Sequence, residues 1–181
     1  MMLLLSAVVA TAQNHPPCGV LLKADAIFYA GTKDEKSDSI TVCDDGNASG
    51  AHSFSAPALG DGKSQPDKWT YRRNIGKETT SDLLKFLRSA DVVSLPESLN
   101  LVKPTTSLEV LMHFTTFDRG NPRTVTIRVP APSCGDNLED TPKAVYDLMC
   151  MFSEVSDRVK TGVPPPEGSC GCKSIHEMAG R

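Results

Sequence analysis

The sequence lacks an excess of basic residues and lacks the short motifs that mark common enzyme classes. Its 181 residues include 19 Lys or Arg and 22 Asp or Glu, for a formal net charge of −3 and a pI near 5.8. Proteins dedicated to nucleic acids or anionic membranes need clustered positive charge, so we expect neither as a partner. The patterns HExxH, GxSxG, GxGxxG and the Walker phosphate-binding loop are absent. We therefore expect no cofactor.

The first twelve residues, MMLLLSAVVATA, carry no charge and end in Ala-Thr-Ala. An apolar run that closes on A-x-A resembles the end of a secretory signal, with cleavage before Gln13. The run is too short to span a bilayer as a helix, so we expect no membrane insertion. It has no basic leader, and a short strand or tail is the alternative. We expect residues 1–12 to be a signal segment and the protein to be secreted or periplasmic.

The cysteines are even in number, which fits a chain that is exported. Thiols in oxidising compartments persist as disulfides, although spacing alone does not fix their pairing. The disulfide candidates are Cys18, Cys43, Cys134, Cys150, Cys170 and Cys172. On a helical wheel Cys150 lies about 200° from Leu148, at about 100° per residue, so it is expected to face away from the apolar stripe of its helix. Its partner is then expected in the loop around Cys134 or in the tail.

Residues 106–129 carry the pattern of a β-hairpin. Two runs in which apolar and polar residues alternate flank the turn-forming cluster from Asp118 to Pro122. The apolar positions of the two runs are Leu108, Val110, Met112, Phe114, Val125, Ile127 and Val129. A two-stranded ribbon is marginal alone, so its apolar side requires helices and further strands to cover it.

The rest of the chain supplies those partners. Strands are expected at 20–30, 39–43 and 68–75, and Arg73 falls on the apolar side of its strand, as at a bulge or a sheet edge. Residues 50–65 are expected to form a surface loop, because Gly, Ser, Ala and Pro dominate them.

Two amphipathic helices are also expected. The first is capped within Thr79–Asp82 and carries a Leu-rich stripe. The second starts with Thr141 as its cap and Pro142 at its first helical position. The pattern predicts one α+β domain, an antiparallel sheet of about five strands with two helices packed on one face. This domain covers residues 13–161, and residues 162–181 form a Pro- and Cys-rich tail.

Two constellations could carry chemistry. Cys170, Cys172 and His176 in the tail are a possible ligand set for a soft metal, without a second cysteine pair beside them. Cys43 and His113 could be neighbours on the outer sheet face and act as a nucleophile and its base, although no oxyanion-hole motif accompanies them. A metal-binding protein and a small exported hydrolase or redox enzyme therefore stand as alternatives.

The remaining candidate is the polar face of the sheet. A face of mixed charge with an occasional apolar residue such as Leu111 suits contact with a protein better than a small-molecule pocket. A merely solvated face is the alternative for any one residue. The residues expected on this face are Arg72, Glu109, His113, Thr115, Thr126 and Arg128. We therefore predict an exported, non-enzymatic module that binds another protein.

The order of elements also resembles that of small exported bacterial α+β domains. Two strands precede an aromatic and arginine-rich strand (Trp69 to Arg73), a Leu-rich helix (Leu83 to Leu87), the hairpin and a closing helix. Among similar domains are the emfourin-like inhibitors of secreted metalloproteases, and the likeness covers roughly residues 20–160. The resemblance implies that the partner is a protease, and it transfers no inhibitory residue to this sequence.

Overall fold

The computed structural model describes residues 18–29, 32, 34–54, 67–103, 109–118, 121–130, 141–165 and 172–180. The predicted signal segment lies outside these ranges. The strands are β1 (Val20–Phe28), β2 (Lys36–Cys43), β3 (Asn47–Phe54), β4 (Asp67–Asn74), β5 (Ser98–Asn100), β6 (Glu109–Asp118) and β7 (Asn121–Pro130). The helices are α1 (Lys77–Leu87), α2 (Ala90–Val93), α3 (Lys143–Thr161) and α4 (Ile175–Ala179).

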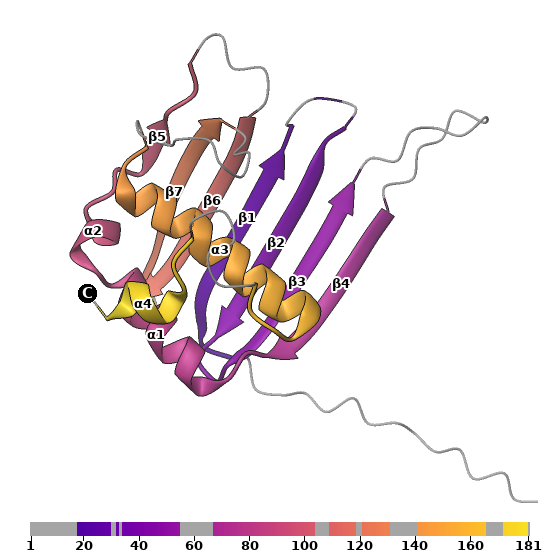
Figure 1. Cartoon of the computed structure of the whole chain (residues 1–181), viewed down its shortest axis with the longest axis vertical. Coiled ribbons are helices and arrows are strands. Elements are labelled where there is room, and N and C mark those ends of the chain that lie inside the picture. Colours follow the sequence, from indigo (N-terminus) through magenta and orange to yellow (C-terminus); the bar gives the residue numbers. More distant parts are fainter. Residues whose placement is uncertain are drawn as a thin grey trace, which may run out of the picture.

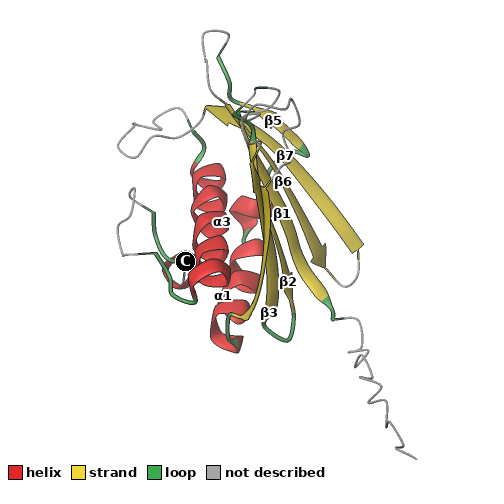
Figure 2. Ribbon diagram, turned by 90° about the vertical axis from the view of Figure 1, so that its right-hand side faces the viewer, coloured by secondary structure: helices red, strands yellow, loops and turns green. Residues whose placement is uncertain are grey.

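All seven strands form one sheet in the order β4-β3-β2-β1-β6-β7-β5 (Figure 1). Every neighbouring pair is antiparallel except β5 and β7, which run parallel. Seen from the side, the helices lie on one face of the sheet, and no described element covers the other (Figure 2). The α+β class and the placement of the two main helices, α1 and α3, are as predicted.

The expected number of about five strands is wrong, because β3 and β5 have weak sequence signals. Strand β3 reads NASGAHSF, and five of its eight residues are Gly, Ala or Ser, which favour strands poorly. It forms because it pairs with β2 on one side and β4 on the other. Residues 50–54 of the predicted loop therefore belong to β3, and its residues 55–65 lie outside the described ranges. Strand β5 has only three residues.

The hairpin formed by β6 and β7 is present as predicted, but Asp118, Asn121 and Pro122 belong to its strands and not to the turn. Leu108 lies outside the described residues. Phe114 faces Val125 and Met112 faces Ile127 across the pair, and all four side chains are buried on the helix side. Phe114 also meets Phe152 of α3 edge-on, with ring centroids 6.3 Å apart. The hairpin thus contacts α3 through this pair of rings.

Helix α1 begins earlier than the cap prediction at Thr79–Asp82. Gly76 takes a φ of 86°, open mainly to glycine, and the helix starts at the next residue without a side-chain cap. The hydroxyl of Thr80 instead donates to the Gly76 carbonyl oxygen at 2.8 Å. The expected stripe is present, since Leu83, Phe86 and Leu87 are buried.

Helix α3 also starts one residue away from its prediction. Pro142 is the residue before the helix, with an extended ψ of 135°, so Thr141 is not the cap. The apolar stripe of α3 is buried against the sheet as expected. Cys150, expected on the exposed side, is only 2% exposed, because the C-terminal tail packs over it. The tail therefore covers the position that the sequence pattern leaves exposed, and the expected bond to the tail is present.

Two disulfides join the described cysteines, Cys18–Cys43 and Cys150–Cys172. Of the two partners expected for Cys150, the tail is the one that bonds it, while Cys134 and Cys170 lie outside the described residues. After Cys172 the chain forms α4, whose Ile175 and Met178 enter the core. The disulfides are consistent with an oxidising, extracytoplasmic location. None of the helices described is long and apolar enough to cross a membrane.

Removing the Cys150–Cys172 disulfide should release α4 from α3. The bond joins residues separated by 22 positions, and closing a loop of that size stabilises the folded state by about 3 kcal/mol. We expect the double variant Cys150→Ala and Cys172→Ser to unfold at correspondingly lower denaturant and to exchange its α4 amides faster.

The control is Cys18→Ser with Cys43→Ser, which opens a loop of 25 positions between the start of β1 and the end of β2. This control should lower stability without loosening α4. Equal exchange of the α4 amides in both variants would contradict the role given to the tail disulfide.

Candidate functional site

All six residues predicted for the polar sheet face do lie on the face opposite the helices. Side chains alternate along a strand, and the neighbours of His113, Met112 and Phe114, are buried beneath α3. The same alternation places the other predicted residues on the open side. The full set is Arg72, Glu109, His113, Thr115, Thr126 and Arg128.

His113 lies at the centre of this open face. Its Nδ1 is 3.1 Å from the hydroxyl oxygen of Thr126 on β7. On its other side the register places Asp25 of β1 opposite it. Partial burial raises the pKa of the Asp25 carboxyl, and the nearby His113 partly offsets that rise. The face is therefore packed tightly enough at its centre to withdraw a carboxylate from water.

The other predicted residues divide into near and far neighbours of His113. Thr115 and Thr124 share a hydrogen bond of 2.9 Å one step along the same strands. Glu109 and Arg128 form a long ion pair, with 3.8 Å between Oε1 and Nε. Arg72 lies on β4, four strands from β6 and thus about 19 Å away at about 4.8 Å per strand, so it does not join this group.

Apolar and cationic side chains complete the open face. Ile27 and Leu111 face each other across β1 and β6 and are half-buried. In the described strands, four cations point to this side against the two carboxylates of Asp25 and Glu109, a formal charge of two positive with His113 neutral. The cations are Lys23, Lys68, Arg72 and Arg128. The net charge of this face is therefore opposite in sign to that of the whole chain, which is −3.

A second polar cluster, on the helix side, was not predicted. Asp38 of β2 accepts hydrogen bonds from Lys160 of α3, 3.1 Å from each carboxylate oxygen, and lies 2.6 Å from Nδ1 of His52. Trp69 stacks on His52 and on Phe54, with ring centroids 5.8 and 5.4 Å apart. Only the register of β2, β3 and β4 brings these residues together, so their sequence spacing gave no signal.

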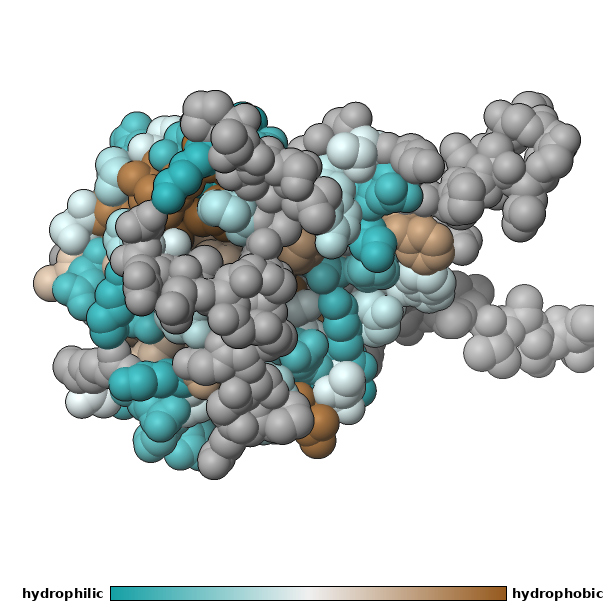
Figure 3. Space-filling view, turned by 45° about the horizontal axis from the view of Figure 1, so that its top comes forward, coloured by the Kyte–Doolittle hydropathy of each residue, from teal (hydrophilic) through white to brown (hydrophobic). Residues whose placement is uncertain are grey.

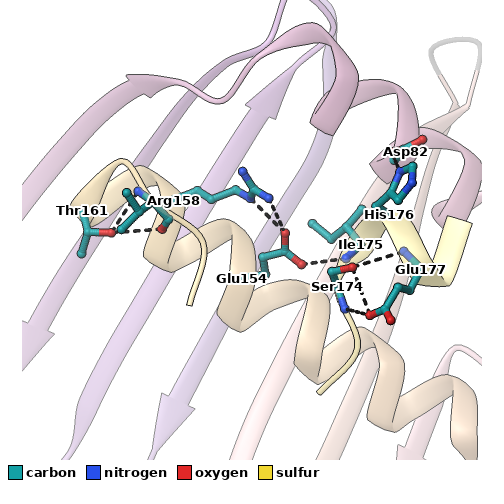
Figure 4. A network of polar contacts seen from close by, with 9 residues as sticks. Asp82, Glu154, Arg158, Thr161, Ser174, Ile175, His176 and Glu177 are labelled. Atoms are coloured by element: carbon teal, nitrogen blue, oxygen red, sulfur yellow. Dashed lines mark hydrogen bonds and ion pairs between the residues drawn. The ribbon is translucent and has the colours of Figure 1, made fainter. Parts of the chain in front are cut away.

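The third polar cluster joins the tail to the helices around a pocket of about 260 Å³ (Figure 4). Glu154 is 4% exposed; one carboxylate oxygen accepts from the Ile175 amide at 2.7 Å, and the other pairs with Arg158. Ser174 caps α4 through a reciprocal pair of bonds with Glu177. These groups satisfy one another, so the cluster acts as a fastening for α4.

His176 completes this fastening by contacting Asp82 of α1, with 2.8 Å between Nδ1 and Oδ2. Its hydrogen bond, together with one from Lys85, holds the pKa of the Asp82 carboxyl below its usual range. The same hydrogen bond with Asp82 raises the pKa of His176. The two residues come from segments 94 positions apart, so sequence reasoning could not pair them.

These contacts and the disulfides occupy residues that the metal-binding and nucleophile hypotheses require. Cys172 is bonded to Cys150 and His176 contacts Asp82, which commits two of the three possible metal ligands in the tail. No group of three His, Cys, Asp or Glu side chains in the described parts of the chain is arranged to hold a metal ion. Cys43, proposed as a nucleophile beside His113, has its sulfur in a disulfide with Cys18.

Hydrophobic residues do not gather on the side shown in space-filling form. Where the residues are coloured, apolar patches are small and separated by hydrophilic side chains (Figure 3). Comparison of the chain with protein-family models, with curated proteins and with solved structures found no match. The resemblance to emfourin-like domains therefore stays a prediction.

The Asp82–His176 contact predicts a pH window for the fastening of α4. Because the pKa of His176 is raised in the folded state, its stabilisation of the fold is complete below the unfolded pKa of about 6.5 and is lost as pH rises through the folded pKa. Because the pKa of Asp82 is lowered, its stabilisation is complete above the unfolded pKa of about 3.9 and is lost as pH falls through the folded pKa. The contribution of the pair should therefore be greatest between about pH 4 and about pH 6.5.

Thermal unfolding of the protein and of His176→Ala across this pH range measures the effect. The melting temperatures should differ most inside the window and converge above it. His176 is 79% exposed, so we expect a small difference. A variant at another exposed site, Lys173→Ala, should show a difference that does not change with pH, and a constant difference for His176→Ala would contradict the pairing.

Proposed function

We propose that this protein is an exported, non-enzymatic module that binds another protein through the open face of its sheet. The observation that carries the proposal is the one-sided construction of the fold. Within the described residues every helix lies on the same side of the sheet, which leaves the other face of its seven strands uncovered. A broad face of this kind suits a protein partner, whereas small ligands bind in concave pockets.

The composition of the face indicates the chemistry of the partner. Ile27 and Leu111 supply apolar area between Lys23 on β1 and Arg128 on β7. Lys68 and Arg72 add positive charge on the same face at the β4 edge. Complementary charge brings partners together and fixes their orientation, while a central apolar contact contributes affinity. We therefore propose a partner with an acidic surface that carries a small apolar group at its middle.

The hydrogen-bonded polar groups of β6 and β7 support the same proposal. Thr115, Thr124, Thr126 and His113 are held in hydrogen-bonded pairs across β6 and β7. Side chains fixed in this way lose little conformational freedom when a partner binds, which lowers the entropic cost of association. Inhibition of a secreted protease is the narrower form of this proposal, and the acidic surface would then belong to the protease.

Charge reversal on the open face tests the proposal. The mature chain is used to capture partners from the secreted fraction, and the affinity of any captured protein is then measured with purified components. The double variant Lys23→Glu and Arg128→Glu should weaken that affinity by about tenfold or more, because like charges brought together cost several kcal/mol.

The control is Lys77→Glu, which makes one such charge reversal at the start of α1, on the side of the sheet that carries the helices. It should bind like the unaltered protein. An equal loss of affinity in the control, or no loss of affinity in the double variant, would contradict the proposal for this face. Titration of the mature protein against purified secreted proteases tests the narrower proposal of inhibition.

A further inference from the structure

Strand β4 forms one outer edge of the sheet, and its outer side is uncovered within the described residues (Figure 1). It has eight residues, contains no proline, and pairs with β3 in an unbroken register. The opposite edge, β5, has only three residues. Only β4 therefore offers an edge long enough to accept another strand.

The register shows which main-chain groups of β4 are available. The amide of Ile75 donates to the carbonyl oxygen of Gly46 at 2.9 Å, which continues the ladder between β4 and β3. Main-chain groups along an antiparallel strand alternate between its two sides. The N–H and C=O groups of Lys68, Thr70 and Arg72 therefore point away from β3.

Side chains at this edge differ on the two faces. Lys68 and Arg72 flank Thr70 on the open face, and all three are exposed. On the helix face, Tyr71 packs against the core and Trp69 is 45% exposed, although it stacks on two rings of β3. A large aromatic residue left this exposed at a sheet edge provides apolar contact area for an incoming chain.

We propose that β4 binds an extended, acidic segment of another protein as an added antiparallel strand. The segment has acidic residues opposite Lys68 and Arg72, a small residue opposite Thr70, and apolar residues opposite Trp69 and Tyr71. The main-chain hydrogen bonds supply affinity, and the alternating side chains supply selectivity. This surface is separate from the centre of the open face and does not depend on the function proposed for it.

The charges at the edge argue against a second copy of the chain as the occupant. Two β4 strands that pair about a two-fold axis at Thr70 would place Lys68 directly opposite Arg72, twice. Like charges directly opposite each other destabilise a strand pair. Cations on a sheet edge also protect a protein against edge-to-edge aggregation. They do not repel an acidic strand, which can therefore still pair with this edge.

The probe for this proposal is a capped, fluorescent peptide with Glu-Val-Thr-Val-Glu at its centre. Its anisotropy is followed while the full chain, with its disulfides intact, is added. Saturable binding that weakens with salt is expected, since the contact depends on exposed charges. The pair Lys68→Glu and Arg72→Glu should weaken binding by about tenfold or more and should instead bind the peptide Lys-Val-Thr-Val-Lys.

Two matched pairs test the added hydrogen bonds. N-methylation of the central Thr of the peptide removes an amide that points toward β4, and N-methylation of a Val removes one that points away. On the protein, Thr70→Pro removes an outward N–H without removing a bond to β3, and Thr70→Val keeps it. Only the first member of each pair should abolish binding, and the peptide pair decides if Thr70→Pro does not fold.

Absence of saturable binding to the unaltered protein, or equal binding of the two methylated peptides, would overturn the proposal. So would an acidic peptide that binds equally well after both charges are reversed. The open-face variant Lys23→Glu with Arg128→Glu should bind the peptide normally. This last measurement separates failure at the edge from failure of the function proposed for the open face.

Discussion

The fold depends on the packing of α3 against one side of the sheet. The helix lays Val145, Leu148, Phe152, Val155 and Val159 on the apolar residues of the central strands, all of them buried. Burying each of these side chains is worth roughly 1.5–3 kcal/mol, so this contact contributes a large share of the apolar stabilisation of the domain. Because α3 and α1 use the same side, the other face has to be built from residues that tolerate water. The exposed polar face is thus a direct consequence of where the core lies.

The tail shows how a short segment is held on such a domain. Helix α4 has five residues, too few to be stable alone. It is held by a disulfide to Cys150, by its two apolar side chains, by the Ile175 amide on Glu154, and by His176 on Asp82. The Ile175 amide and the Arg158 guanidinium compensate the burial of the Glu154 carboxylate, which would be costly without these partners. The tail therefore completes the core instead of merely following it.

The hairpin, both main helices and the open face were predictable, because strong periodicity at 106–129 and amphipathic stripes give local signals. Strand β3 was missed because NASGAHSF forms a strand only between two neighbours, a tertiary effect that no local pattern records. The Asp38 and Asp82 clusters were missed for a related reason. Each cluster joins residues from distant segments, and their proximity depends on strand register or on the path of the tail. The helix starts at Gly76 and Pro142 were predicted wrongly because both helices begin without a side-chain cap.

The distribution of charge connects the open face with the edge. The sequence carries a formal −3, while the open face carries two positive charges, so the remaining residues carry a formal −5. Lys68 and Arg72 belong both to the open face and to the edge of β4, so the positive potential is continuous across them. A field with one positive side orients an acidic partner before contact and accelerates association. An acidic protein bound to the open face would therefore also lie close to the edge of β4, so that one partner contacts both surfaces.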